Sequence, residues 1–259
     1  MQGSFCVLEI NDDVDVQLTR QLIPSDNTTI KLEVNEKLID DITTEIHGDT
    51  LTIGNNNSLN WIRPYNSTVK ATVYYKSIKT ISFNSNGSLN SDIIHGYPVY
   101  GSDASANKTH LYLEVNGGSG DIDLNIQCDN IHTNYNWGTS AVKLSGDVSI
   151  AYTSTRYNCH GPIDSQDLET SFHYIYAYGT NKVIAKAFNQ INAVNKNNGI
   201  VCYVRYHTVR DEIIWGHYDE NNVWIPMQTV PVEYSCPKEI IYQGPGPEAT
   251  TGLDSIVIQ

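Results

Sequence analysis

The feature that most constrains the fold is a short motif that recurs with a period near 20 residues. Each copy is a segment of alternating apolar residues, then a turn rich in Gly, Asn and Ser, then a second alternating segment. Aligned on the first apolar residue after the turn, the copies are separated by 33, 20, 21, 20 and 17 residues. The aligned residues are Leu89, Ile122, Val142, Ile163, Val183 and Ile200. A unit this short cannot bury its apolar side alone, so the copies must stack on one another.

The repeat predicts an all-β fold of one kind, a single-stranded parallel β-helix (solenoid) with about 20 residues per coil. Inward-facing Ile, Val and Leu would form ladders from coil to coil, and small residues at the corners would permit tight bends. An antiparallel sandwich or barrel is the alternative, although its turns recur roughly every 8–12 residues. The 33-residue gap fits one coil that carries an insertion near Gly96–Asn107.

The repeat predicts one domain, residues 5–259, with a non-repeat insertion or cap at about 208–238. This stretch contains Trp215, Trp224 and three prolines, and it breaks the alternation. The open end of a parallel stack presents unpaired strand edges, which a cap would cover. A binding insertion is the alternative interpretation.

Charge and composition limit the classes of molecule that this chain is expected to bind. The chain has 16 basic and 29 acidic residues and a net charge of −13, which predicts an acidic, soluble surface and argues against nucleic acid as a partner. The five cysteines form no CxxC pair, which argues against zinc. There is no apolar run of about 20 residues and no signal peptide. The abrupt start at Met1–Ser4 suggests a mature form whose targeting segment has been removed.

Four stretches resemble one known family. They are Phe5–Leu18, which ends in Asp-Val-Asp-Val; Gly48–Ile53; the corner Gly118-Ser119-Gly120-Asp121-Ile122; and Ile241–Pro245, with its Tyr-x-Gly ending. Together they resemble the auto-transporter adhesin head GIN domain family, a domain of unknown function common in Bacteroidetes. The resemblance implies an exported protein with a right-handed β-helical fold, and its name suggests adhesion. It supplies no catalytic, cofactor-binding or metal-binding residues.

The stretch Gly117–Leu124 invites comparison with the calcium sites of β-roll repeats, which read G-G-x-G-x-D-x-U. Here the aspartates, Asp121 and Asp123, fall at the fifth and seventh places rather than the sixth, and the motif occurs once. We therefore predict that both are solvated strand residues and that the chain holds no metal.

An aromatic stripe could stack on sugars or fill the core. It comprises Phe172, Tyr174, Tyr176 and Tyr178. Tyr176 precedes Val183 by seven residues, as Val115 precedes Ile122. This alignment predicts that Phe172, Tyr174 and Tyr176 point inward and form a broad core layer.

His110 and His132 each neighbour inward residues, so both are expected to point outward on adjacent coils, with their positions offset by two residues. They are the best candidates for a catalytic pair in a carbohydrate-active β-helix enzyme. The arginines Arg156, Arg205 and Arg210 are scattered, and no phosphate loop, HExxH or GxSxG motif is present. We therefore predict no catalytic residues and no cofactor.

These observations predict a non-enzymatic exported β-solenoid of the cell envelope, an adhesin or a surface-binding or structural module. It would reside in the periplasm, in the outer membrane or at the cell surface, with a glycan or an envelope protein as its partner. The alternative is a polysaccharide lyase or hydrolase-like β-helix enzyme, which would need a groove lined with acids and a base.

The cap interpretation is testable. Deleting Thr208–Lys238 should expose apolar surface and promote aggregation, measured by size-exclusion chromatography with light scattering. A deletion variant that stays monomeric and as stable as the intact chain would contradict the cap.

Overall fold

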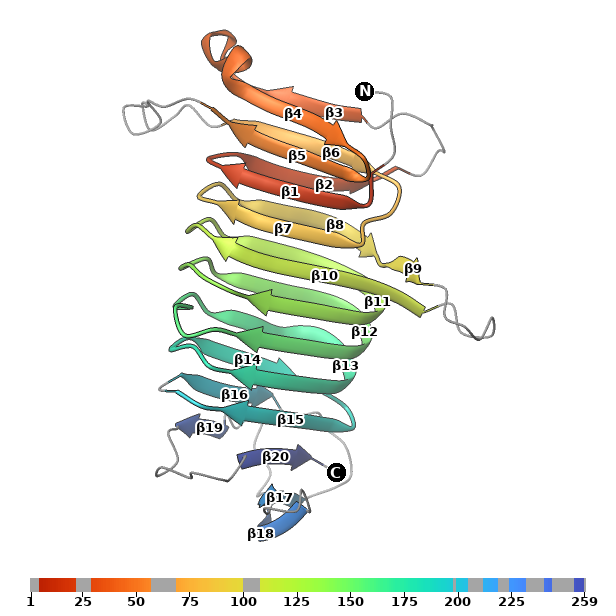
Figure 1. The fold of residues 1–259 in the computed structure, drawn as a ribbon. Coiled ribbons are helices and arrows are strands. Elements are labelled where there is room, and N and C mark those ends of the chain that lie inside the picture. The colour runs from red at the N-terminus through yellow and green to blue at the C-terminus, as the bar shows by residue number, and fades with distance from the viewer. Residues whose placement is uncertain are drawn as a thin grey trace.

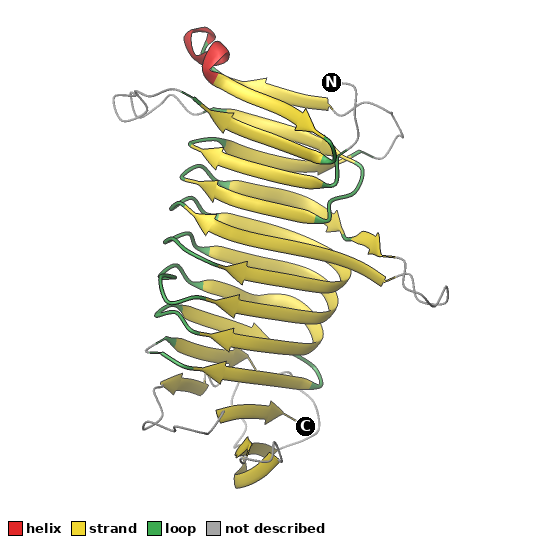
Figure 2. Ribbon diagram, viewed as in Figure 1, coloured by secondary structure: helices red, strands yellow, loops and turns green. Residues whose placement is uncertain are grey.

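The computed structural model describes residues 5–21, 29–56, 69–99, 108–197, 199–204, 212–218, 224–231, 240–243 and 254–258. Apart from one 3-10 helix, η1 (Glu36–Asp41), the regular structure in these ranges is β-strand (Figure 2), so the all-β prediction is confirmed. Seventeen strands form one curled, mixed sheet and three form a second sheet. No helix in the described part of the chain has the length and hydropathy needed to cross a membrane.

The large sheet folds over into two faces with the core between them (Figure 1). Face A contains, in order of pairing, β3 (Thr29–Glu33), β6 (Lys70–Tyr75), β2 (Asp15–Arg20), β8 (Leu89–His95), the first halves of β11 (Ile122–Tyr135), β12 (Val142–Thr155) and β13 (Ile163–Ala177), then β14 (Lys182–Lys186), β16 (Ile200–Val204) and β19 (Ile240–Gln243). Face B contains β4 (Ile42–His47), β5 (Thr50–Asn55), β1 (Val7–Asp12), β7 (Thr80–Ser85), β10 (Lys108–Gly117), the second halves of β11, β12 and β13, and β15 (Gln190–Asn195).

Consecutive repeats pair in parallel and in the predicted register. Ile122 lies beside both Leu89 and Val142, and Val142 lies beside Ile163, which in turn lies beside Val183. We call each strand segment on face B, with the loop and the face-A segment that follow it, a rung. The last predicted copy is wrong by one residue, because Val183 pairs with Val201 rather than Ile200. The unbroken apolar run Ile200-Val201-Cys202 carries no alternation that could fix its register.

The large sheet is mixed, whereas the sequence predicted a purely parallel one. Antiparallel pairs close the stack at β3–β6 and β4–β5 near the N-terminus and at β16–β19 beyond the last rung. Near the predicted insertion, β9 (Tyr97–Val99) pairs antiparallel with the start of β10. The physical reason is that a parallel stack exposes unpaired backbone groups at its ends, and a strand that turns back can cover them.

The core is built from columns of inward side chains, one from each rung. The column Leu111–Ile131–Ala151–His173–Ile191 shows how the volumes compensate, because the small Ala151 lies beside the large His173. All five side chains are buried. Close packing of this kind tolerates little change in volume, so each column holds its neighbours in register.

The loops from face B to face A gather along one edge of the stack, where Figure 2 shows them one above another. The corner Gly118–Ile122 explains why its glycines are needed. Gly118 has φ +91°, which L side chains rarely adopt. A Cβ on Gly120 would lie 1.7 Å from the carbonyl oxygen of Gly87 in the neighbouring corner. The corners therefore stack with backbone directly against backbone.

Only part of the predicted 208–238 insertion lies within the described residues. There β17 (Glu212–Tyr218) and β18 (Trp224–Pro231) form a separate antiparallel sheet with β20 (Asp254–Ile258). Figure 1 places these strands beyond the last rung, with β20 next to β15. Their role as a cap and the single-domain boundary 5–259 remain predictions.

The corner geometry generates a stability prediction. Gly120→Ala should lower the free energy of unfolding by about 2 kcal/mol or more, because the added Cβ meets backbone atoms that cannot rotate away. Urea unfolding measures the effect. Ser119→Ala, at an exposed position in the same corner, serves as the control and should cost about 0.5 kcal/mol or less. Equal stability of the two variants would contradict the proposed contact.

Candidate binding groove along the stacked corners

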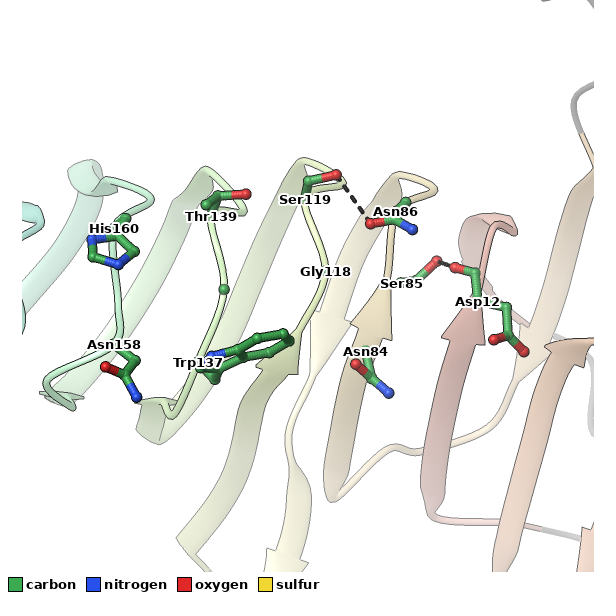
Figure 3. A pocket seen from close by; sticks show the side chains of 11 residues that line it. Asp12, Asn84, Ser85, Asn86, Gly118, Ser119, Trp137, Thr139, Asn158 and His160 are labelled. Carbon is green, nitrogen blue, oxygen red and sulfur yellow. Dashed lines mark hydrogen bonds between the residues drawn. The ribbon is translucent and has the colours of Figure 1, made fainter. Parts of the chain in front are cut away.

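A groove of about 800 Å³ runs across five successive corners (Figure 3). Its residues come from the end of β1, from the β7–β8 corner and from the three corners that follow β10, β11 and β12. The groove therefore runs along the stack, across the direction of the strands. Its amide and hydroxyl side chains are Asn84, Ser85, Asn86, Ser119, Thr139 and Asn158; Asp12, Gly118, Trp137, Gly138 and His160 complete it.

Polar side chains form a row along this edge, each reaching the next rung. Asn86 donates to a carboxylate oxygen of Asp13 at 2.9 Å. Ser119 donates to the amide oxygen of Asn86 at 3.1 Å, the bond that Figure 3 shows as a dashed line between these two residues. Farther along, His160 Nδ1 lies 2.8 Å from the hydroxyl oxygen of Thr180. Because these contacts join adjacent rungs, they order the groups that the groove presents.

Trp137 is the exposed aromatic side chain in the groove, with 56% of its surface accessible. Figure 3 shows its ring extending from its own corner toward Gly118. A Cβ on Gly117 would lie 3.0 Å from Cε3 of Trp137 and 2.3 Å from the amide oxygen of Asn84. The missing side chain of Gly117 therefore makes room for both groups.

Asp12 is the only Asp, Glu, Lys or Arg among the residues that line the groove. Its carboxylate accepts a hydrogen bond from the backbone N–H of Asn55 at 3.2 Å, which ties it to β5. His160, the other titratable group of the groove, lies at the opposite end of the row of corners. The groove therefore does not bring an acid and a base together.

The outer surface of face B carries a stack of rings, Tyr112–His132–Tyr152–Tyr174. Successive ring centroids are 4.7, 4.6 and 5.3 Å apart, and the interplanar angles are 13°, 7° and 16°. Each ring thus covers the face of the next and turns its edge to solvent. A sugar stacks on a ring face, so we assign this ladder to stabilising the stack rather than to binding.

The prediction that Phe172, Tyr174 and Tyr176 point inward is wrong. The buried residues of this segment are His173, Ile175 and Ala177, and Tyr176 is exposed. The cause is a corner of different length, because Ala177 precedes Val183 by six residues where Val115 precedes Ile122 by seven. A slip of one residue turns every side chain of a strand to the other face.

His110 and His132 point outward on adjacent rungs with an offset of two residues, as predicted. Their ring centroids are 6.1 Å apart, and Nε2 of His110 lies 3.2 Å from the amide nitrogen of Asn130. Burial lowers the pKa of both imidazoles. Neither histidine lines the groove.

Asp121 and Asp123 are both exposed, as predicted for solvated strand residues. Among the residues that the structure describes, no three His, Cys, Asp or Glu side chains gather as a metal ion would require. Cys6, Cys128 and Cys159 are free thiols. Arg156 is exposed, while Arg205 and Arg210 lie outside the described residues. The absence of a metal or cofactor stays a prediction.

Sequence reasoning did not find the groove itself. Its residues are spread from Asp12 to His160, and only the pairing of the strands brings them together. The corner Asn136-Trp137-Gly138 has a large aromatic residue where the preceding corner has Gly117, and this difference is visible in the sequence. That was the available signal.

Three comparisons place the chain among known proteins. The family model described as "Putative auto-transporter adhesin, head GIN domain" matches residues 4–205. A crystal structure of a "putative adhesin" from Bacteroides fragilis NCTC 9343 has a TM-score of 0.66 at 17% identity, covering 80% of this chain and 88% of that chain. No curated protein matches the chain.

Two structures from Parabacteroides distasonis ATCC 8503 are also similar, each with a TM-score of 0.50. One is described as a "putative lipid binding protein", with 15% identity over 79% of this chain and 93% of that chain. The other is a "putative adhesin", with 13% identity over 80% and 88%. At these identities the likeness concerns the fold.

The buried histidine of the core generates a pH prediction. His173 Nε2 lies 2.9 Å from the Thr153 hydroxyl oxygen, and burial lowers the pKa of the imidazole to about 4. The backbone of Lys186 opposes this shift in part, although Nδ1 makes no hydrogen bond of normal geometry.

Because the unfolded chain binds the proton more readily, stability should be full above pH about 6.5 and fall by up to about 3 kcal/mol as the pH drops to about 4. Urea unfolding at several pH values measures the slope. His173→Gln should flatten it between pH 7 and 5, and an unchanged slope in that variant would assign the acid sensitivity to other groups.

Proposed function

Because the chain belongs to the head GIN domain family of auto-transporter adhesins, we propose that it is a non-enzymatic binding module of the bacterial cell envelope. The match covers most of the chain, and a structural relative is itself described as a "putative adhesin". The module is proposed to be exported to the periplasm, the outer membrane or the cell surface, in line with what an adhesin requires.

The scaffold we propose is a parallel β-solenoid of about 20 residues per turn, right-handed as the family resemblance implies. The register of β11 on β12 and of β12 on β13 supports it, since each segment lies beside the one about 20 residues later on both faces. Antiparallel strands are additions at its ends and at the insertion.

The observation that carries the binding function is the groove along the corners. It is long, amide and hydroxyl side chains are among its lining residues, it exposes the aromatic side chain of Trp137, and it crosses five rungs. Such a surface fits an extended polymer of the cell surface, a glycan or an envelope protein. Hydrolysis or elimination would need an acid and a base that converge on one bond, whereas Asp12 and His160 lie at opposite ends of the groove.

Binding through this groove can be tested directly. The purified chain should bind to at least one of three surfaces: a glycan array, immobilised mucin, or outer membranes isolated from a Bacteroidetes bacterium. Trp137→Ala should weaken that binding at least about tenfold, because truncating a central Trp commonly removes a large share of binding energy. Surface plasmon resonance or co-sedimentation measures the isotherms.

Tyr176→Ala is the matched control, since it removes an exposed aromatic side chain of face B that lies outside the groove. It should bind as the unaltered chain does. Equal binding by Trp137→Ala, or no binding to any of the three surfaces, would contradict the proposed function.

A further inference from the structure

We propose that the groove binds a neutral, linear polysaccharide that lies along the stack, with a sugar ring on the face of Trp137. This inference rests on the proposed binding function and names its ligand class. It follows from the shape of the groove, from the chemistry of its side chains and from its charge.

The shape of the groove selects an extended ligand. Adjacent strands of a sheet lie about 4.8 Å apart, so successive corners offer similar groups at that spacing. The repeat is close to the length of one sugar residue in an extended polysaccharide. A volume of about 800 Å³ lies toward the upper end of the usual range for ligand sites, which suits several sugar residues rather than one.

Trp137 supplies the apolar contact that a sugar needs. A pyranose ring has a face of C–H groups, and an indole face covers it without requiring any particular hydroxyl pattern. The space above Gly117 lets the indole reach the neighbouring rung, so it lies across two of the five corners instead of projecting from a single one.

The polar side chains match hydroxyl groups. Amides and hydroxyls both donate and accept hydrogen bonds, as sugar hydroxyls do, whereas a carboxylate only accepts and an ammonium only donates. The groove offers such groups from consecutive corners in Asn86, Ser119 and Thr139. Asn84 adds another beside the Trp137 ring.

Charge, lining and strand pairing each argue against one competing class of ligand: acidic polysaccharides, lipids and peptides. No Lys or Arg lines the groove and the chain carries a net charge of −13, so an acidic polysaccharide would be repelled. A lipid chain would need a continuous apolar surface, whereas four successive corners each place at least one amide or hydroxyl side chain in this groove. A peptide strand would need a free sheet edge, and corners in the middle of the stack offer none.

The experiment is isothermal titration calorimetry of the full chain with hexasaccharides of neutral β-glucan, mannan and xylan. Oligogalacturonate is the anionic probe and phosphatidylcholine vesicles are the lipid probe. The expected result is binding of at least one neutral series, with affinity rising at least tenfold from disaccharide to hexasaccharide. Oligogalacturonate and vesicles should bind at least tenfold more weakly.

Variants locate the ligand. Trp137→Ala should lose at least tenfold in affinity, Trp137→Phe should lose less, and Tyr176→Ala should be unchanged. Gly117→Ala keeps every polar group but pushes aside the Trp137 ring and the Asn84 amide, so it should also weaken binding. Circular dichroism and thermal unfolding confirm that each variant is folded.

Three results would overturn the inference. If oligogalacturonate or vesicles bind more tightly than the neutral glycans, the proposed ligand class is wrong. If a neutral glycan binds and Trp137→Ala leaves its affinity unchanged, the binding site lies outside the groove. If no neutral glycan binds while outer membranes still bind in a Trp137-dependent manner, the ligand class is wrong and the proposed function stands. Loss of all binding would overturn both.

Discussion

Parallel backbone pairing between consecutive segments is the interaction on which every other feature depends. It runs along both halves of β11, β12 and β13, from Ile122 beside Val142 to Tyr135 beside Thr155. Once this register is fixed, residues at the same position of successive rungs lie in a column along the stack. An inward column is core, an outward column on face B is the ring ladder, and the corner column is the groove. One pattern of hydrogen bonds therefore positions both the scaffold and the candidate site.

The same pairing creates a difficulty at the ends, since a parallel stack never satisfies its own last edge. The chain meets this by reordering its first rungs. The N-terminal strand β1 lies between β5 and β7, and β2 lies between β6 and β8, so the first rung is enclosed on both sides. The edge that remains is covered by β3 and β4, which run antiparallel. A mixed sheet is the consequence of closing a parallel one.

The sequence allowed the strands, the parallel register of the central rungs and the buried alternation to be predicted, because a period of two within each segment and near 20 between segments is written in its apolar residues. The predictions were wrong at positions where the apolar alternation carries no information about register. The corners vary in length, so counting back from Val183 placed Tyr174 and Tyr176 on the wrong face. At Ile200–Cys202 consecutive apolar residues left two registers equally good. The groove was missed because its columns join Asp12 to residues more than 140 positions away, which no local pattern reveals.

The corners are also where this chain departs from its own repeat, and those departures are what the groove requires. The corner Gly118–Ile122 keeps small residues, as stacking of backbone on backbone demands. Its neighbours substitute Trp137 and Thr139 in one corner and Asn158 and His160 in the next, yet the strands on either side keep their register. A loop at a corner can change its side chains, and even its length, without moving the core columns that lock the rungs. The specificity of the proposed binding can therefore vary through the corners while the stack that carries them stays the same.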